Sequence, residues 1–208
     1  MKLLRETIRK LILEEVCAGA TAKIQQGLDE IEKRDLVIQV DMKGQDGYNV
    51  VLKQNGGPGH YYGLYEVGTS RLCPTYITMW TDVNPTLQKT GIGAVLYDVA
   101  IEVATQLGGY LACDRGSVTD EAKRMWRYYN ASDDYEAFQM DTRDGYYTPD
   151  DKSDDCKQTI FHRDTGIPSH RDPTAYKEEF MDSPFTKAYR KKRITTIPCL
   201  GDRYRESN

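Results

Sequence analysis

The sequence predicts an α+β (mixed α/β) fold, in which a mostly antiparallel sheet is flanked by helices. Residues 36–42 and 48–54 are β-rich runs joined by a Gly44–Gly47 turn, which predicts a hairpin. Further along, a glycine turn, an apolar helix over 94–104 and a short strand over 110–113 follow one another. That order is typical of a βαβ unit, so we expect one splayed parallel pair inside the sheet.

Length and charge limit the architecture and the partners. A chain of 208 residues favours one domain with appendages, which we place at 1–15, 16–164 and 165–208. Lysine and arginine number 28 against 32 aspartate and glutamate, a net charge of -4, which argues against a nucleic-acid partner. Because no apolar run approaches the roughly 20 residues of a membrane span, we expect no membrane partner.

The first segment has an amphipathic pattern. Leu3, Leu4, Ile8, Leu11 and Ile12 recur at helical spacing, and charged residues interrupt them, unlike a secretion signal. Residues 1–15 are therefore either a docking helix or a processed targeting peptide.

The remaining elements follow from periodicity and turn residues. We expect a helix within 17–33 and strands over 63–68 and 75–82. A further helix should be capped by Thr119 or Ser117, with Ala122, Met125, Trp126 and Tyr129 on one face. Residues 141–157 read as a loop and 159–162 as a last strand. Recurring prolines and the basic run 187–193 predict an extended tail over 165–208, packed on the domain or on a partner.

The five cysteines predict free thiols. Cys17, Cys73, Cys113, Cys156 and Cys199 are widely spread, odd in number and without a CxxC pair, which favours a reducing compartment over a disulfide framework. The three histidines have no partner at zinc-ligand spacing, so no metal is expected.

The turn at 88–93 places two glycines at the start of a helix. Glycine lets backbone N–H groups approach a ligand, and the helix N-terminus adds partial positive charge, so the turn suits a phosphate or pyrophosphate. No Gly-Lys-Ser/Thr follows, and the third glycine of a dinucleotide fingerprint is missing. A helix entry without a ligand remains the alternative.

Gln88, Gly91 and Gly93 match the pattern Q/R-x-x-G-x-G/A, and the element order over 1–140 resembles the GNAT acetyltransferase superfamily. The resemblance implies a GNAT-like fold in which acetyl-CoA lies in a V-shaped gap between strands 75–82 and 110–113. The residues it implies for acetyl-CoA binding are Thr78, Trp80, Gln88, Lys89, Thr90, Gly91, Ile92 and Gly93. The implied activity is acetyl transfer to an amine whose identity stays open.

A narrower resemblance covers nearly the whole chain. Segments 63–67, 96–100, 114–122, 126–129, 147–151 and 183–189 look like GNAT-like proteins encoded by large tailed bacteriophages. It implies a protein in the host cytoplasm or in the virion, where the N-terminal helix and the tail would contact virion proteins. A hydrophobic-x-Glu pattern at 12–14 and 13–15 fits head-protein processing in such phages. The alternative function is thus a structural or packaged virion protein with little or no catalysis.

Acetyl transfer to an amine requires a base for the amine and an acid for the departing thiolate. By resemblance the acid is a tyrosine in the helix that follows strand 110–113. Trp126 stands at the usual tyrosine position, so Tyr129 is our first candidate and Tyr128 the second. Glu66, Asp82 and Asp114 are candidate bases at or near strand ends. Asn130-Ala131 replaces the usual Gly-Phe, which leaves a degenerate site or purely structural roles open.

Overall fold

The computed structural model describes residues 15–17, 20–57, 60–69, 75–113, 118–140, 142–143, 146–147 and 182–207. Within this part of the chain, eight strands form one mixed sheet in the order β10-β1-β2-β3-β4-β5-β9-β6. The strands are β1 (Leu36–Met42), β2 (Gly47–Gln54), β3 (Tyr61–Thr69), β4 (Thr75–Val83), β5 (Tyr110–Ala112), β6 (Tyr135–Gln139), β9 (Lys187–Lys191) and β10 (Tyr204–Ser207). Only β4–β5 and β1–β10 pair in parallel, which confirms the predicted α+β fold with a mostly antiparallel sheet.

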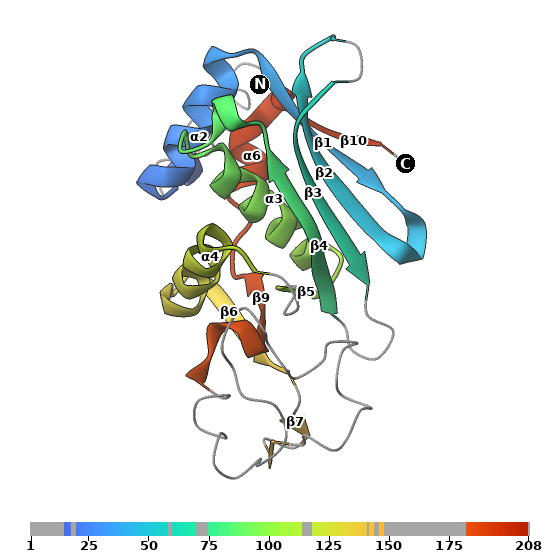
Figure 1. The fold of residues 1–208 in the computed structure, drawn as a ribbon, viewed down its shortest axis with the longest axis vertical. Helices are drawn as coiled ribbons and strands as arrows, with labels where there is room; N and C mark the ends of the chain where they lie inside the picture. Colours follow the sequence, from blue (N-terminus) through green and yellow to red (C-terminus); the bar gives the residue numbers. More distant parts are fainter. Residues whose placement is uncertain are drawn as a thin grey trace, which may run out of the picture.

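Helices gather on one side of strands β1–β4 (Figure 1). They are α2 (Ala22–Lys33), α3 (Ile92–Gln106), α4 (Asp120–Ala131) and α6 (Thr196–Leu200), with short 3₁₀ turns at Gly44–Asp46, Pro85–Leu87, Pro184–Thr186 and Gly201–Arg203. Strands β7 (Thr142–Arg143) and β8 (Tyr146–Tyr147) pair separately, inside the segment predicted as a loop. The helix predicted near the N-terminus and the strand predicted at 159–162 lie outside the described residues.

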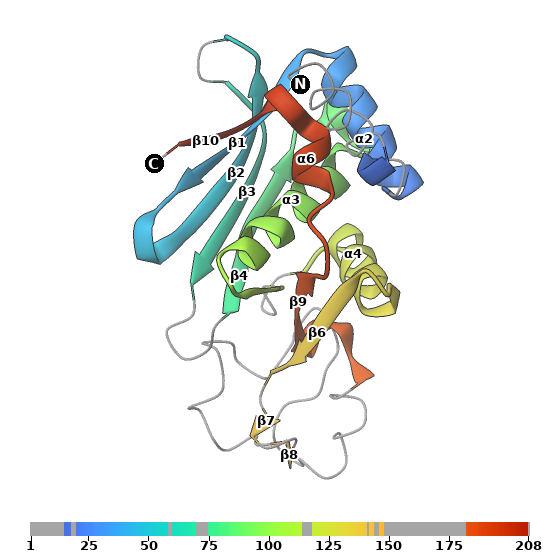
Figure 2. The same cartoon turned by 180° about the vertical axis from the view of Figure 1, so that it is seen from behind.

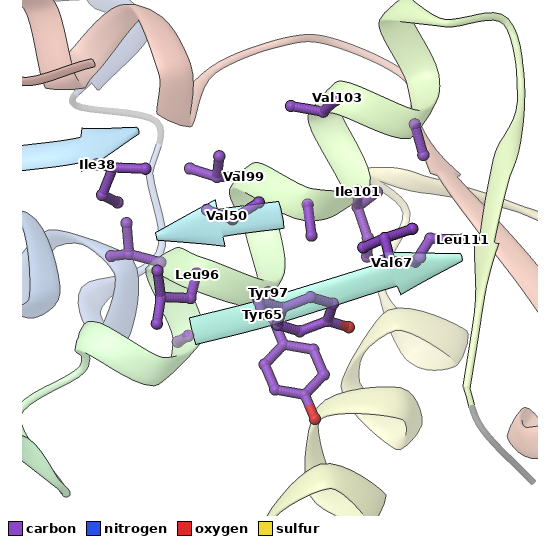
Figure 3. Close-up of a cluster of buried hydrophobic side chains, with 14 of the residues drawn as sticks. Ile38, Val50, Tyr65, Val67, Leu96, Tyr97, Val99, Ile101, Val103 and Leu111 are labelled. Carbon is purple, nitrogen blue, oxygen red and sulfur yellow. The ribbon is translucent and has the colours of Figure 1, made fainter. Parts of the chain in front are cut away.

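The predicted hairpin is confirmed, and it supplies the face on which α3 packs. β1 and β2 pair from Leu36–Gln54 to Met42–Tyr48, joined by the expected turn. Their inward side chains, with those of β3, contact α3 in one apolar cluster (Figure 3). Fully burying each aliphatic side chain of this kind contributes about 1.5–3 kcal/mol. The Tyr48 hydroxyl also donates to the Ala100 carbonyl at 2.6 Å, which ties β2 to the middle of α3.

Residues 187–207 correct the prediction of an extended tail over 165–208. β9 lies inside the sheet between β5 and β6, and β10 pairs with β1 at the opposite edge. Ala188 and Tyr189 of β9 are fully buried. The basic residues around them concealed this strand, because Lys187, Arg190 and Lys191 gave the segment the composition of a solvated tail.

A buried polar cluster anchors the C-terminal segment to α3. Asp98 and Glu102 of α3 are 0% exposed, and Lys191 of β9 is 8% exposed. The Lys191 ammonium donates to Glu102 at 2.8 Å and also to Asp98. Asp98 further accepts from the hydroxyls of Tyr135 and Thr196. Every ionised group in the cluster therefore has several partners, which is the condition under which buried charge is tolerated.

The charged groups of this cluster shift one another's pKa values. Burial alone would lower the pKa of Lys191, but the carboxylates of Asp98 and Glu102 outweigh that effect and raise it. Burial, and then the charge of Asp98, raises the pKa of Tyr135. Lys191 is thus cationic and Tyr135 neutral at physiological pH.

The cysteine prediction is wrong for one pair. Cys17 and Cys199 form a disulfide with a Cα–Cα distance of 5.5 Å across 182 residues of sequence. Their partnership arises because α6 lies beside α2 and α3 (Figure 2), a proximity that sequence spacing does not reveal. Cys113 is a buried thiol whose sulfur contacts the Phe185 carbonyl at 3.4 Å, whereas Cys73 and Cys156 lie outside the described residues.

Candidate active site

Strands β4 and β5 pair only at their first residues. The parallel ladder joins Thr75–Ile77 to Tyr110–Ala112 and then stops. β4 continues to Val83 beside β3, with a register shift that leaves Met79 as the extra residue of a β-bulge. On the β5 side, residues 78–83 have no strand partner in the described part of the chain. The backbone groups of this stretch that do not face β3 are therefore not used by any strand of the described residues.

Thr78 closes the point where the two strands separate. Its hydroxyl donates to the Ala112 carbonyl at 3.1 Å. Because that hydrogen is used, the Tyr65 hydroxyl is the donor in the 2.7 Å contact between the two side chains. Thr78 is buried, and its side chain joins β3, β4 and β5. A contribution of Thr78 to acetyl-CoA binding, as the resemblance implies, would have to come from its backbone.

The glycine turn follows β4 directly and leads into α3. Gln88 donates to the Val83 carbonyl at 3.2 Å, and the Thr90 hydroxyl donates to the Leu87 carbonyl at 2.6 Å, so both side chains hold the turn in shape. Lys89 is exposed and has a φ of 65°, a left-handed conformation that is uncommon for residues other than glycine. The outward position of Lys89 places a cationic side chain next to the start of α3.

Gly91 and Gly93 have different structural roles in this turn. Gly91 has a φ of 89°, and a Cβ there would lie 2.5 Å from the Lys23 carbonyl and 2.7 Å from the Gly27 nitrogen of α2. Glycine is therefore required at 91 by the fold itself. A Cβ at Gly93 would meet nothing within 4 Å. The absence of a side chain at 93 keeps open the space in front of the helix.

The first turn of α3 is available to an anion. Gly91 is the N-cap residue and makes no side-chain capping bond, and the first bond along the helix is from the Val95 nitrogen to the Gly91 carbonyl at 3.2 Å. The N–H groups of Ile92, Gly93 and Ala94 precede that bond and are the unsatisfied donors of the helix start. Together with the helix dipole they form a site suited to phosphate.

Aromatic side chains fill the region between α3 and α4. Trp126 contacts Tyr97, Tyr129 and Tyr189, with ring centroids 6.0, 5.6 and 5.8 Å away. Tyr97 in turn meets Tyr65 edge to face at 4.6 Å, and the two rings lie side by side in Figure 3. The Thr119 cap of α4 is confirmed by its 3.2 Å contact with the Ala122 nitrogen.

The candidate acids lie within this aromatic packing. Tyr129 is 2% exposed, and its hydroxyl has no hydrogen-bond partner among the described residues. Burial raises the pKa of Tyr129 well above its ordinary value, so the phenol is protonated at neutral pH. Tyr128 is half-buried, and its ring contacts Tyr129 and Tyr135. Trp126, at the position where the family pattern has tyrosine, is buried and has no acidic proton to give.

The candidate bases lie on the other face of the sheet. Glu66 pairs across the strands with Trp80, on the face opposite to that of Tyr65. Glu66 forms an exposed 3.5 Å ion pair with Lys43, and Trp80 is 61% exposed. Asp82 is exposed on the same face as Trp80, and Asp114 lies outside the described residues. The structure thus groups Glu66, Trp80 and Asp82, and separates them from Tyr128 and Tyr129.

In the part of the chain that the structure describes, no three histidine, cysteine or acidic side chains come together in a way that would hold a metal ion. No helix among the described residues has the length and apolar character needed to cross a membrane.

The solved structures to which this chain is similar include acetyltransferases. No protein-family model and no curated protein matches the chain. Among solved structures, the chain is similar to an IAA acetyltransferase from Bacillus cereus ATCC 14579, with 25% identity over 48% of this chain and a TM-score of 0.35. A GNAT-family acetyltransferase from Staphylococcus aureus Mu50 shares 12% identity over 58% of this chain and 68% of its own, with a TM-score of 0.34. A nourseothricin acetyltransferase shares 18% over 53% of this chain and 76% of its own, with a TM-score of 0.35. The match spans 63% of the Bacillus enzyme, less than two thirds of its length.

Sequence reasoning missed the polar cluster of Asp98, Glu102 and Lys191. A partial signal existed, because Asp98 and Glu102 lie one turn apart on a helix whose other residues from Ala94 to Ala104 are apolar or aromatic, and such a helix is buried. Carboxylates within it must then find buried partners. Lys191 is 89 residues from Glu102 in sequence, so no local pattern identifies it as that partner.

Proposed function

We propose that this protein is an acyl-CoA-dependent N-acyltransferase that transfers an acetyl group from acetyl-CoA to an amine. The observation that carries the proposal is the course of β4, which loses its β5 partner after Ile77 and leads at its far end into the glycine turn and the start of α3, which has no side-chain cap and has open space at Gly93. One end of this arrangement suits a pyrophosphate and the other suits the amides of an extended pantetheine chain. The two features share one strand, so a single elongated ligand satisfies both.

Each part of acetyl-CoA has candidate partners among the residues of this site. The backbone of Ile92 and Gly93 would hold the pyrophosphate, with the exposed Lys89 adding positive charge. Residues 78–83 would offer backbone partners to the amides. Bound acetyl-CoA supplies the activated acetyl group. Tyr129, whose phenol is neutral, is the candidate proton donor, with Tyr128 second. Glu66 and Asp82 are the candidate bases for the amine, but they lie on the opposite face of the sheet from both tyrosines, so one acetyl-transfer centre uses either the tyrosines or the carboxylates.

A thermal-shift titration with acetyl-CoA, CoA and longer acyl-CoAs tests the proposal. A ligand at about 100 times its Kd stabilises the folded protein by roughly 2.7 kcal/mol. Gly93→Ala is the matched variant, because its Cβ meets no protein atom and enters only the space assigned to the phosphate. Without ligand we expect stability that is equal to that of wild type or up to about 1 kcal/mol higher. With acyl-CoA we expect an affinity at least about tenfold lower, or 1.4 kcal/mol. Wild type that none of these compounds stabilises would refute acyl-CoA binding.

A second candidate is a structural or packaged phage virion protein without catalysis. Two observations favour loss of catalysis: Trp126 occupies the usual tyrosine position, and the hydroxyl of Tyr129 is enclosed by aromatic rings. The phage assignment rests on the sequence resemblance, with virion proteins as partners and the host cytoplasm or particle as location. Mass spectrometry of purified particles tests it. Absence of the chain from particles rejects this candidate, and a chain beginning at Glu15 identifies processed cargo.

A further inference from the structure

The Cys17–Cys199 disulfide joins α6, which is hydrogen-bonded to α3, to the segment that precedes α2. Cys199 belongs to α6, whose first residues are bonded to Glu102 of α3. Cys17 precedes α2, and its carbonyl accepts from the Ala20 nitrogen at 3.1 Å, just before the Thr21 cap of that helix. The bond therefore ties the entry of α2 to a firmly held element. We infer that the Cys17–Cys199 pair is a reversible thiol–disulfide site whose state controls how firmly α2 supports the glycine turn.

Small thiols can reach this bond through an adjoining cavity. The cavity has a volume of about 200 Å³ and is lined by both cysteines and by Gln25, Asp29, Glu32 and Arg203. Leu28, Ile31 and Leu200 complete its walls, so polar and charged groups lie beside an apolar surface that a small thiol can contact. Accessible disulfides are the labile and regulatory ones, in contrast to those enclosed in an apolar core. The location is thus one where low-molecular-weight thiols can exchange with the bond while the protein stays folded.

The helix that the disulfide tethers is the one that cradles the glycine turn. The Lys23 carbonyl and the Gly27 nitrogen of α2 lie 2.5 and 2.7 Å from the place a Gly91 Cβ would take. A Cβ at Gly27 would in turn lie 2.6 Å from the Gly91 carbonyl. The two backbones approach each other closely at these glycines, and the Val95 side chain packs beside Gly27. A displacement of the first turns of α2 is therefore transmitted to Gly91 and the start of α3.

A low-molecular-weight thiol of the glutathione class reduces the bond by thiol–disulfide exchange, and its disulfide form restores it. A thiolate of the reductant attacks one sulfur of the pair, forming a mixed disulfide and releasing the other cysteine as a thiolate. A second reductant thiol then attacks the mixed disulfide. The products are one oxidised reductant disulfide and two cysteine thiols, and the reverse sequence restores the bond.

Hydrogen exchange in glutathione buffers of defined ratio tests the inference. Cys73→Ser and Cys156→Ser together form the background, leaving the pair and Cys113 as the only cysteines. We expect a linked Cys17–Cys199 peptide in oxidising buffer. On reduction, exchange of the hydrogen-bonded amides in 24–33 and 95–98 should accelerate by about tenfold or more, while β2 and β3 stay protected. Cys17→Ser and, separately, Cys199→Ser should exchange at the fast rate in both buffers. Failure to form the linked peptide, or exchange that reduction leaves unchanged, overturns the inference.

One consequence rests on the proposed function: acyl-CoA should bind about tenfold more weakly to the reduced protein. Titrations with acetyl-CoA in both buffers separate the two ideas. If exchange responds to reduction and no acyl-CoA binds in either state, the proposed function fails and the redox site stands. If acetyl-CoA binds equally and exchange is unchanged, the redox site fails and the proposed function stands.

Discussion

Helices α3 and α6 begin in opposite ways. At α6, the N–H groups of Thr195, Thr196 and Ile197 each donate to the Glu102 carboxylate at 2.7 Å. At α3, the corresponding groups follow Gly91 without any side-chain cap. A helix start attracts negative charge in both cases. At α6 the protein itself supplies that charge through Glu102, whereas at α3 no side chain caps the helix, and this is where we propose that the pyrophosphate binds.

The largest expected effect comes from disrupting the buried cluster of Asp98, Glu102 and Lys191 at the start of α6. Lys191→Met removes the only cation described in the cluster and leaves Asp98 and Glu102 buried without it. Removing one partner of a buried ion pair typically costs about 3–5 kcal/mol. We expect that loss in the free energy of unfolding measured by urea denaturation. Lys192→Met is the matched control, because this exposed neighbour should change stability by less than about 0.5 kcal/mol. A Lys191→Met loss as small as the control's would mean that the buried pair adds nothing to stability.

Gly91→Ala tests the structural half of the glycine turn. Its φ of 89° and the 2.5 Å approach to the Lys23 carbonyl both oppose a side chain. We expect a loss of about 2–3 kcal/mol in unfolding free energy. Gly93→Ala should not lower stability and should raise it by up to about 1 kcal/mol, since its Cβ meets nothing within 4 Å and alanine restricts the unfolded chain. If both substitutions destabilise equally, the distinction between a fold glycine and a ligand glycine is wrong.

Alkaline pH should lower the free energy of unfolding gradually. The folded-state pKa of Lys191 is raised above its ordinary value of 10.5, mainly by Asp98 and Glu102 against the opposing effect of burial. A raised pKa gives stability that is complete below the unfolded pKa and lost as pH rises through the folded one. Burial likewise raises the pKa of Tyr97 to about 12. Unfolding free energy should therefore be level below about pH 10 and fall above it, by up to about 1.4 kcal/mol per pH unit for each such group. The slope should be shallower in Lys191→Met and unchanged in Lys192→Met.

The sequence predicted the parts of the fold that local patterns control. Period-two runs and the Gly44–Gly47 turn located β1 and β2, and Thr119 located the start of α4. β9 and β10 were missed because each is short, charged and stabilised by strands far away in sequence. The disulfide and the Lys191 cluster were missed for the same reason, since both depend on contacts made only after the sheet has formed.

The candidate site was predictable only in part. The glycines at 91 and 93 could be located from their spacing, but their separate roles follow from how closely α2 approaches Gly91. Strand alternation implies opposite faces for Glu66 and Tyr65, yet it does not show which face α4 covers. Whether Tyr129 acts in catalysis depends on its immediate surroundings, which sequence cannot supply.

Tyr129→Phe is expected to change stability least. It tests whether a tyrosine of α4 takes part in catalysis. The substitution removes a buried hydroxyl that has no partner among the described residues, so unfolding free energy should stay within about 1 kcal/mol of wild type or rise. If the hydroxyl protonates the departing thiolate, turnover falls by roughly 10²–10⁴-fold while CoA affinity is nearly unchanged. Tyr128→Phe, on the adjacent half-buried ring, is the matched control. Unchanged turnover in Tyr129→Phe with a loss in Tyr128→Phe assigns the acid to Tyr128. If neither substitution lowers turnover, both tyrosines serve packing alone, and α4 contributes structure where the start of α3 contributes binding.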